Sequence, residues 1–226
     1  MSDLSVYLKS TPYFDFDEAS VRAFADAVVD SSAIDPVEIA TALYLAVRDD
    51  IRYNPYSFDK DAKSMSASWV LEHKSTYCVP KAVLLGAVAR YKRIPSRLGL
   101  ADVRNHVASP QFVEMLGTNV FAMHGYIELF LEGRWVKATP AFNAELCEIM
   151  GVVPLEFNGR EDSIFHEFTD DGRKHMEYLK DYGTFDDVPY DFFVQSIKEA
   201  YPHMDAFIEE YGVGKSLEQD MAALKS

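Results

Sequence analysis

The chain has 226 residues, and 48% of them are hydrophobic, so it can bury a substantial core and wholesale disorder is not expected. Its 22 basic and 36 acidic side chains give a formal net charge of −14. This charge argues against a nucleic-acid-binding protein, because phosphate recognition depends on clustered Lys and Arg, and it also disfavours docking on anionic lipid.

Cysteine content and the length of the apolar runs indicate a cytoplasmic protein. The two cysteines, Cys78 and Cys147, are too few for a secreted scaffold held together by disulfides. The N-terminus has no basic segment followed by an apolar core, so no signal peptide is predicted. The longest apolar run, residues 82–89, is far shorter than a membrane span. We therefore expect no membrane contact.

Three N-terminal segments have the signals of helices. Residues 16–30 carry apolar side chains at helical spacing. Residues 35–51 begin with Asp35 as a predicted N-cap, and Glu38 completes a capping box. Residues 66–73 predict a short third helix.

The next segment predicts a central helix that begins at a cysteine. Ser75 or Thr76 can cap it, and residues 78–92 are apolar nearly all round, which is typical of a helix in the core. Pro95 cannot continue a helix, so we expect the helix to end before it.

Strands are expected after this helix. Residues 96–103 predict one strand, and residues 124–140 predict a hairpin that turns at Gly133. With a two-residue turn, one face of the hairpin is almost entirely apolar: Ile127, Leu129, Leu131, Val136 and Ala138. The opposite face carries His124, Tyr126, Trp135, Lys137 and Thr139. A register slip of one residue would mix these two sets, so the alternation supports this pairing.

Cys78 stands where a thiol can become a nucleophile. The first turn of a helix offers free N–H groups and the positive end of the helix dipole, and both lower the pKa of a thiol. Such a cysteine needs a histidine partner that acts first as a base and then as an acid. The alternative interpretation of Cys78 is a small buried side chain without a chemical role.

His124 is the strongest partner among the six histidines, because it opens a strongly patterned strand. In the predicted hairpin, Thr139 is a diagonal neighbour of His124 on the same face, at about 7–8 Å between the backbones, so its side chain can reach the imidazole. We expect the other five histidines outside the site: His73 on the short helix, His106 in a loop, and His166, His175 and His203 on the surface.

Four short motifs follow one another in a defined order: Cys78 at a helix start, RIPSR at 93–97, His124 at a strand start, and WVKATP at 135–140. Together they resemble the transglutaminase-like superfamily of papain-type thiol enzymes. The resemblance covers about residues 37–143, and it matches Cys78 to the nucleophile and His124 to the base. The terminal segments resemble a bacterial subgroup known as transglutaminase-like "putative cysteine proteases".

The resemblance implies an α+β, papain-like transglutaminase-core fold. In it, N-terminal helices pack on an antiparallel sheet, and a helical extension follows at the C-terminus. We expect one domain over residues 1–226, with its core at about 37–143 and the extension at 144–226.

The chain departs from the family pattern at Thr139, where the family has an aspartate that orients the histidine. An aspartate fixes the tautomer and stabilises the imidazolium, whereas a threonine hydroxyl accepts the same N–H bond without charge. Three outcomes are open. Thr139 orients His124 weakly, Asn143 supplies the orienting side chain, or the protein is catalytically weak or inert.

The sequence gives weaker evidence about the oxyanion hole and about any cofactor. The backbone N–H of Cys78 would act with a side-chain donor, for which Tyr56, Tyr77 and Trp69 are candidates. No spacing typical of a zinc site or of a nucleotide-binding loop occurs in the sequence, so we expect neither a metal nor a cofactor.

The predicted function is acyl transfer on an amide or peptide-like bond through a Cys78 thioester. The substrate would be a peptide, a protein or a small amide, and water or an amine would accept the acyl group. One alternative is a weak or inert binding module. Another is an arylamine-type acyltransferase. Such an enzyme would have an Arg-Gly-Gly-rich segment before its cysteine, and residues 72–78 contain none. The sequence does not define an oligomeric state.

Overall fold

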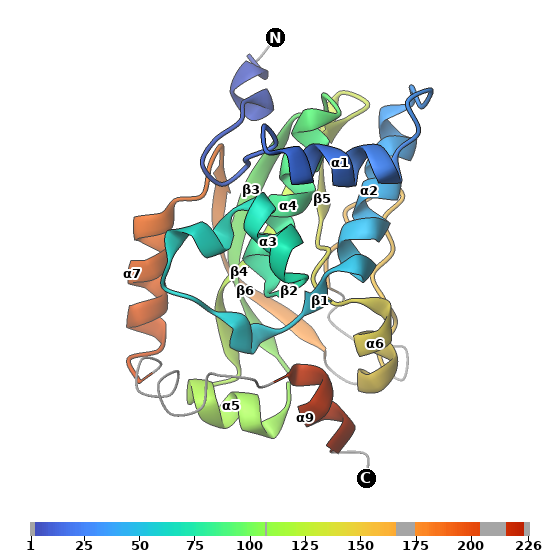
Figure 1. The fold of residues 1–226 in the computed structure, drawn as a ribbon. Helices are drawn as coiled ribbons and strands as arrows, with labels where there is room; N and C mark the ends of the chain where they lie inside the picture. The colour runs from blue at the N-terminus through green and yellow to red at the C-terminus, as the bar shows by residue number, and fades with distance from the viewer. Residues whose placement is uncertain (1–2, 107, 166–174, 204–215, 224–226) are drawn as a thin grey trace.

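The computed structural model describes residues 3–106, 108–165, 175–203 and 216–223. It has a four-stranded antiparallel sheet in the order β5-β4-β3-β6, with helices packed on one face (Figure 1). The strands are β3 (Ser96–Asn105), β4 (Val120–Leu131), β5 (Arg134–Ala138) and β6 (Met176–Phe185). The α+β class expected from the sequence, with N-terminal helices packed on an antiparallel sheet, is confirmed.

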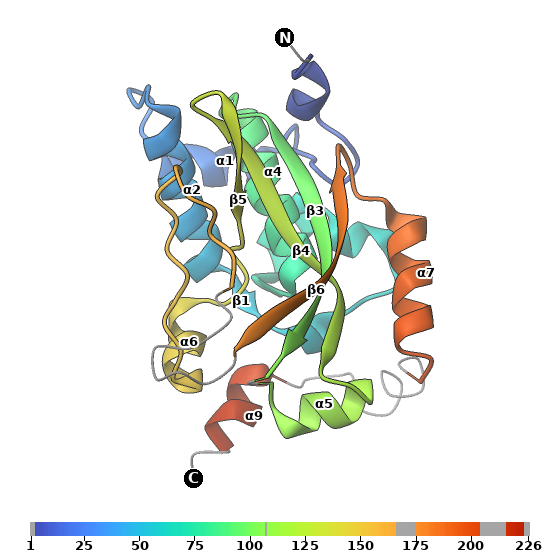
Figure 2. The ribbon, with the colours of Figure 1, turned by 180° about the vertical axis from the view of Figure 1, so that it is seen from behind.

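Helix α4 (Cys78–Tyr91) occupies the middle of the fold. It packs on β3 and β4 on one side and on three helices on the other (Figures 1 and 2): α1 (Ala19–Val28), α2 (Pro36–Asp50) and α3 (Ala67–His73). Every residue from Cys78 to Arg90 is buried. The apolar surface all round this helix therefore corresponds to a helix enclosed on all sides.

The predicted helix starts are confirmed for two of the N-terminal helices. The Asp35 side chain accepts a hydrogen bond from the Val37 N–H at 2.8 Å, and Ser66 caps α3 by accepting from Trp69. The predicted cap of α4 is wrong. Ser75 and Thr76 instead form strand β2, which pairs in parallel with β1 (Arg52–Tyr53), so Tyr77 is the N-cap and its side chain makes no capping bond.

The predicted hairpin register is confirmed. Leu129 pairs with Val136 and Ile127 with Ala138, and the apolar face between β4 and α4 is fully buried. Glu132 and Gly133 form the two-residue turn with φ values of 49° and 84°, the left-handed geometry that such turns need.

The C-terminal third contains a strand that the sequence pattern did not predict. Strand β6 pairs with β3 at the edge of the sheet, and α7 (Tyr190–Ala200) follows it along the flank of the sheet. Helix α7 is part of the helical extension expected over residues 144–226, and within that range residues 166–174, 204–215 and 224–226 lie outside the described residues. Three short helices complete the fold: α5 (Pro110–Leu116), α6 (Ala144–Met150) and α9 (Leu217–Ala223).

None of the helices in the described ranges has the length and apolarity needed to cross a membrane.

A buried lysine ties the end of α2 to the first turn of α4. The Lys81 Nζ donates to the backbone carbonyls of Arg48 and Ile51 at 2.8 and 2.5 Å. Arg48 lies in the last turn of α2 and Ile51 is its C-cap, where a helix leaves its carbonyl acceptors unsatisfied. Burial lowers the pKa of Lys81 to about 7.

Helix α4 and strand β4 meet at Gly125 with almost no space between their backbones. A Cβ atom at Gly125 would lie 2.7 Å from the Cα of Val79, which is closer than real Cβ contacts. Since Val79 follows Cys78, this contact sets the position of the cysteine over the strand.

Substitution Gly125→Ala should destabilise the fold by about 1–3 kcal/mol, because the added methyl group forces α4 and β4 apart. Chemical denaturation measures the loss. The double variant Gly125→Ala/Val79→Ala should not recover stability, because the nearest atom is backbone and not side chain. A fully stable Gly125→Ala variant would contradict this close approach.

Candidate active site

Cys78 is the first residue of α4, and its sulfur lies against the start of β4. The Sγ accepts a hydrogen bond from the Gly125 N–H at 3.4 Å, and the residue is only 8% exposed. Burial raises the pKa of the thiol to about 11, although the N–H groups of Gly125, Val79 and Cys78 itself lower it. In the described state the thiol is therefore protonated at neutral pH.

His124 precedes Gly125 on β4 and is enclosed by aromatic rings. It is 3% exposed, and its ring centroid lies 5.4 Å from that of Phe165. Its Nε2 is buried and has no hydrogen-bond partner among the residues that the structure describes. Burial lowers the pKa of His124 to about 4, so the imidazole is neutral at pH 7.

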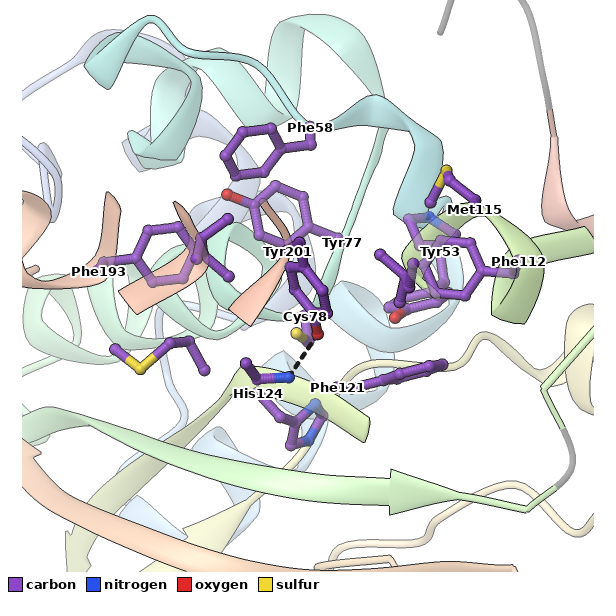
Figure 3. A pocket seen from close by; sticks show the side chains of 15 residues that line it. Tyr53, Phe58, Tyr77, Cys78, Phe112, Met115, Phe121, His124, Phe193 and Tyr201 are labelled. Atoms are coloured by element: carbon purple, nitrogen blue, oxygen red, sulfur yellow. Dashed lines mark hydrogen bonds between the residues drawn. The ribbon is translucent and has the colours of Figure 1, made fainter. Parts of the chain in front are cut away.

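Cys78 and His124 line the same cavity of about 70 Å³ (Figure 3). The walls are mostly aromatic and aliphatic side chains, among them Phe58, Phe112, Met115, Phe121, Phe193 and Ile197. The structure thus brings the two predicted site residues to one crevice, as the proposed chemistry requires.

Thr139 lies just after β5 and is 1% exposed. Its carbonyl accepts a bond from the Tyr44 hydroxyl at 3.2 Å. Its hydroxyl lies close to that of Tyr178, and within the described ranges neither completes a hydrogen bond of normal geometry. Burial raises the pKa of Tyr178 to about 12, against the lowering effects of the Phe165 N–H and of Thr139.

The Asn143 side chain is held elsewhere. Its Oδ1 accepts from the Tyr53 N–H at 3.1 Å, so it fixes β1. This contact makes Asn143 a weaker candidate than Thr139 for orienting His124.

Of the three predicted oxyanion donors, Tyr77 alone is among the residues that line the cavity. The Tyr56 hydroxyl bonds to the Asp220 carboxylate, and Trp69 stacks on His73 with ring centroids 3.7 Å apart. Tyr77 lines the cavity, but its hydroxyl lies on the far side of its ring from the Cys78 sulfur, toward Phe58 (Figure 3).

The sequence interpretation missed the contribution of α7 to the cavity. Phe193, Ile197 and Tyr201 line it from the C-terminal third. The amphipathic pattern of residues 190–201 signals a face that must be covered, but it does not specify the surface that covers it.

One of the other histidines was placed wrongly. His175 was expected on the surface, yet it is 6% exposed and packs on Phe165 at 5.7 Å between ring centroids, because the unpredicted strand β6 begins directly after it. His73, His106 and His203 are exposed, and His166 lies outside the described residues. The second cysteine, Cys147, is free and buried.

The described side chains contain no group of three or more His, Cys, Asp or Glu residues that could hold a metal ion.

Comparison with known protein families identifies the family of this chain. A sequence model of the transglutaminase-like superfamily matches residues 22–140, more than half of the chain. The chain belongs to the transglutaminase-like superfamily. The matched range contains Cys78, His124 and Thr139.

The other comparisons add little to this transglutaminase-like assignment. No curated protein matches the chain. Among solved structures, it is similar to a "Putative Cysteine Protease from Cytophaga hutchinsonii", at 16% identity and a TM-score of 0.47. The similarity covers 62% of this chain and 42% of that chain.

Burial of His124 in the cavity should make stability depend on pH. The folded pKa, about 4, lies below the ordinary value of 6.5, so the unfolded chain binds more protons and stability is lost as pH falls from 6.5 to 4. Between pH 7 and pH 4 this contribution is about 3 kcal/mol. Denaturant titrations of wild type and His124→Phe should show that difference. Equal pH dependence in the two proteins would show that His124 does not titrate in this way.

The raised pKa of Cys78 predicts slow alkylation at neutral pH. With Cys78 buried as in the structure, iodoacetamide labelling should be half-maximal near pH 11, because the reactive thiolate forms only near that pH. The variant Cys78→Ala reports any background from Cys147. Labelling at a midpoint below the ordinary thiol value of about 8.5 would instead indicate a preformed thiolate–imidazolium pair.

Proposed function

We propose that this chain is a cysteine-dependent acyl-transfer enzyme that acts on amide or peptide-like bonds through a thioester. The observation that carries the proposal is the shared cavity of Cys78 and His124. Membership of the transglutaminase-like superfamily supports it, because members of that superfamily are often cysteine proteases or acyltransferases.

The first half of the reaction forms the thioester. The Cys78 Sγ attacks the carbonyl carbon of the substrate while the thiol proton passes to His124. The backbone N–H of Cys78 at the helix start would stabilise the oxyanion. When the C–N bond breaks, His124 returns the proton to the leaving amine. Because the thiol has the higher pKa, the transfer accompanies the attack and does not precede it.

The second half releases the acyl group. Water or an amine attacks the thioester carbonyl, His124 takes a proton from this nucleophile, and the proton returns to the Cys78 sulfur as the C–S bond breaks. With water the enzyme is a hydrolase, and with an amine it is a transferase of the transglutaminase type.

Thr139 is the positioning residue in this proposal. It stands where the family pattern has an aspartate, and its buried hydroxyl can accept an N–H of the imidazole once the ring moves within reach. A hydroxyl carries no charge, so the imidazolium formed during proton transfer is stabilised less than it would be by a carboxylate.

The second candidate function is a binding module with weak or no catalysis. It is favoured by the protonated thiol, the neutral imidazole and the uncharged Thr139. Such a module would bind peptide-like ligands in the same cavity without forming an acyl adduct.

The decisive experiment compares wild type with Cys78→Ala on p-nitrophenyl acetate and on unfolded β-casein. Because the nucleophile is lost, turnover should fall at least about a thousandfold, with an unchanged melting temperature. Mass spectrometry of acid-quenched wild type should show an acetyl adduct on Cys78, and Cys147→Ala should behave as wild type. Retained turnover by Cys78→Ala would reject the enzyme assignment, and binding of casein without any adduct would favour the binding module.

A further inference from the structure

The first half of strand β4 has an edge on which the structure places no neighbouring strand. Strand β3 pairs with β4 along its length, but β5 pairs only with Ile127–Leu131. Within the described residues, the opposite edge of Val120–Gly125 is therefore not covered by a strand. An edge of this kind presents N–H and C=O groups that can accept a further strand.

A single tyrosine hydroxyl occupies this edge. The Tyr201 hydroxyl accepts a hydrogen bond from the Ala122 N–H at 2.6 Å and donates one to the Val120 carbonyl at 2.9 Å. The dashed line in Figure 3 marks the first of these bonds. Tyr201 is 6% exposed, and it follows α7 at the wall of the cavity.

These two bonds are the ones that an added main chain would make. A residue of an extended polypeptide brings one N–H donor and one C=O acceptor to a strand edge. The Tyr201 hydroxyl supplies the same donor and acceptor with one oxygen atom. It therefore occupies the place of a main chain on β4.

The same edge leads to the nucleophile. The Gly125 N–H points to the Cys78 sulfur, as their 3.4 Å contact shows. Gly125 is three residues beyond Ala122, and because Met123 between them has a φ of 58° at a bulge in β4, the two positions lie at most about 10 Å apart. An extended chain held at Ala122 would thus reach Cys78 within three residues, and its side chains on one face would enter the apolar cavity.

We propose that the β4 edge at Val120 and Ala122 is the main-chain binding site for an extended polypeptide substrate. In the structure Tyr201 occupies this site, and we call this arrangement the closed state. This inference rests on the proposed function and narrows its substrate from amides in general to polypeptide chains. Binding requires the Tyr201 hydroxyl to leave the edge, so substrate and α7 compete for the same two backbone groups.

The variant Tyr201→Phe tests this competition. It keeps the ring but removes both hydrogen bonds, so the closed state is weakened and kcat/KM for unfolded β-casein should rise about tenfold. The rise for p-nitrophenyl acetate, which has no peptide main chain, should be much smaller. A fall in turnover of both substrates would overturn the proposal, because it would make the hydroxyl a catalytic donor.

Tyr190→Phe is the matched control, at the opposite end of α7 from Tyr201. The Tyr190 hydroxyl donates to the Lys60 carbonyl at 2.6 Å, so this variant loosens α7 without freeing the β4 edge. It should leave casein turnover unchanged. An equal rise in both variants would show that loosening of α7, and not the Tyr201 bonds, controls access, and the proposal would be wrong. Melting curves establish that both variants are folded.

A binding measurement separates this inference from the proposed chemistry. In Cys78→Ala, the Ala122 amide should exchange slowly with deuterium, because Tyr201 protects it. In Cys78→Ala/Tyr201→Phe it should exchange faster by about tenfold or more, and saturating β-casein should restore protection. No protection by casein would reject the substrate site even if Cys78 is a nucleophile. Protection by casein, combined with a wild type that forms no adduct, would reject the catalytic proposal alone.

Discussion

The contact between Val79 and Gly125 is the constraint on which the rest of the site depends. It joins the backbone of the central helix to the backbone of the central strand, so the two elements approach as closely as their main chains allow. Cys78 precedes one of these residues and His124 precedes the other. Main-chain packing therefore brings the sulfur and the imidazole to one cavity, and their side-chain rotamers contribute little to this placement.

Burial dominates the electrostatics of this arrangement. The start of α4 presents N–H groups that favour a thiolate, yet enclosure by α7 and by the aromatic walls raises the pKa of Cys78 above its ordinary value. The same enclosure keeps His124 neutral. Burial of both side chains thus holds the pair in its uncharged form, and the uncharged side chain of Thr139 acts in the same direction.

Local patterns predicted the parts of the fold that local interactions determine. The hairpin register followed from residue alternation, and the start of α2 followed from Asp35, whose capping bond spans two residues. The cap of α4 could not be predicted in this way, because Ser75 and Thr76 pair with a strand more than twenty residues earlier. The burial of His175 and the place of Tyr201 on β4 likewise depend on contacts between distant segments, and their own neighbours in sequence carry no sign of them.

Because of Lys81, the two sides of the cavity are held in different ways. Its amino group donates to the Arg48 and Ile51 carbonyls at the end of α2, so the first turn of α4, which carries the nucleophile, is held to the α2 backbone. On the other side, α7 contributes to the cavity through side chains such as Phe193 and Tyr201. Substitutions among the α7 side chains can therefore change which ligands the cavity accepts, while the Cys78 sulfur keeps its position.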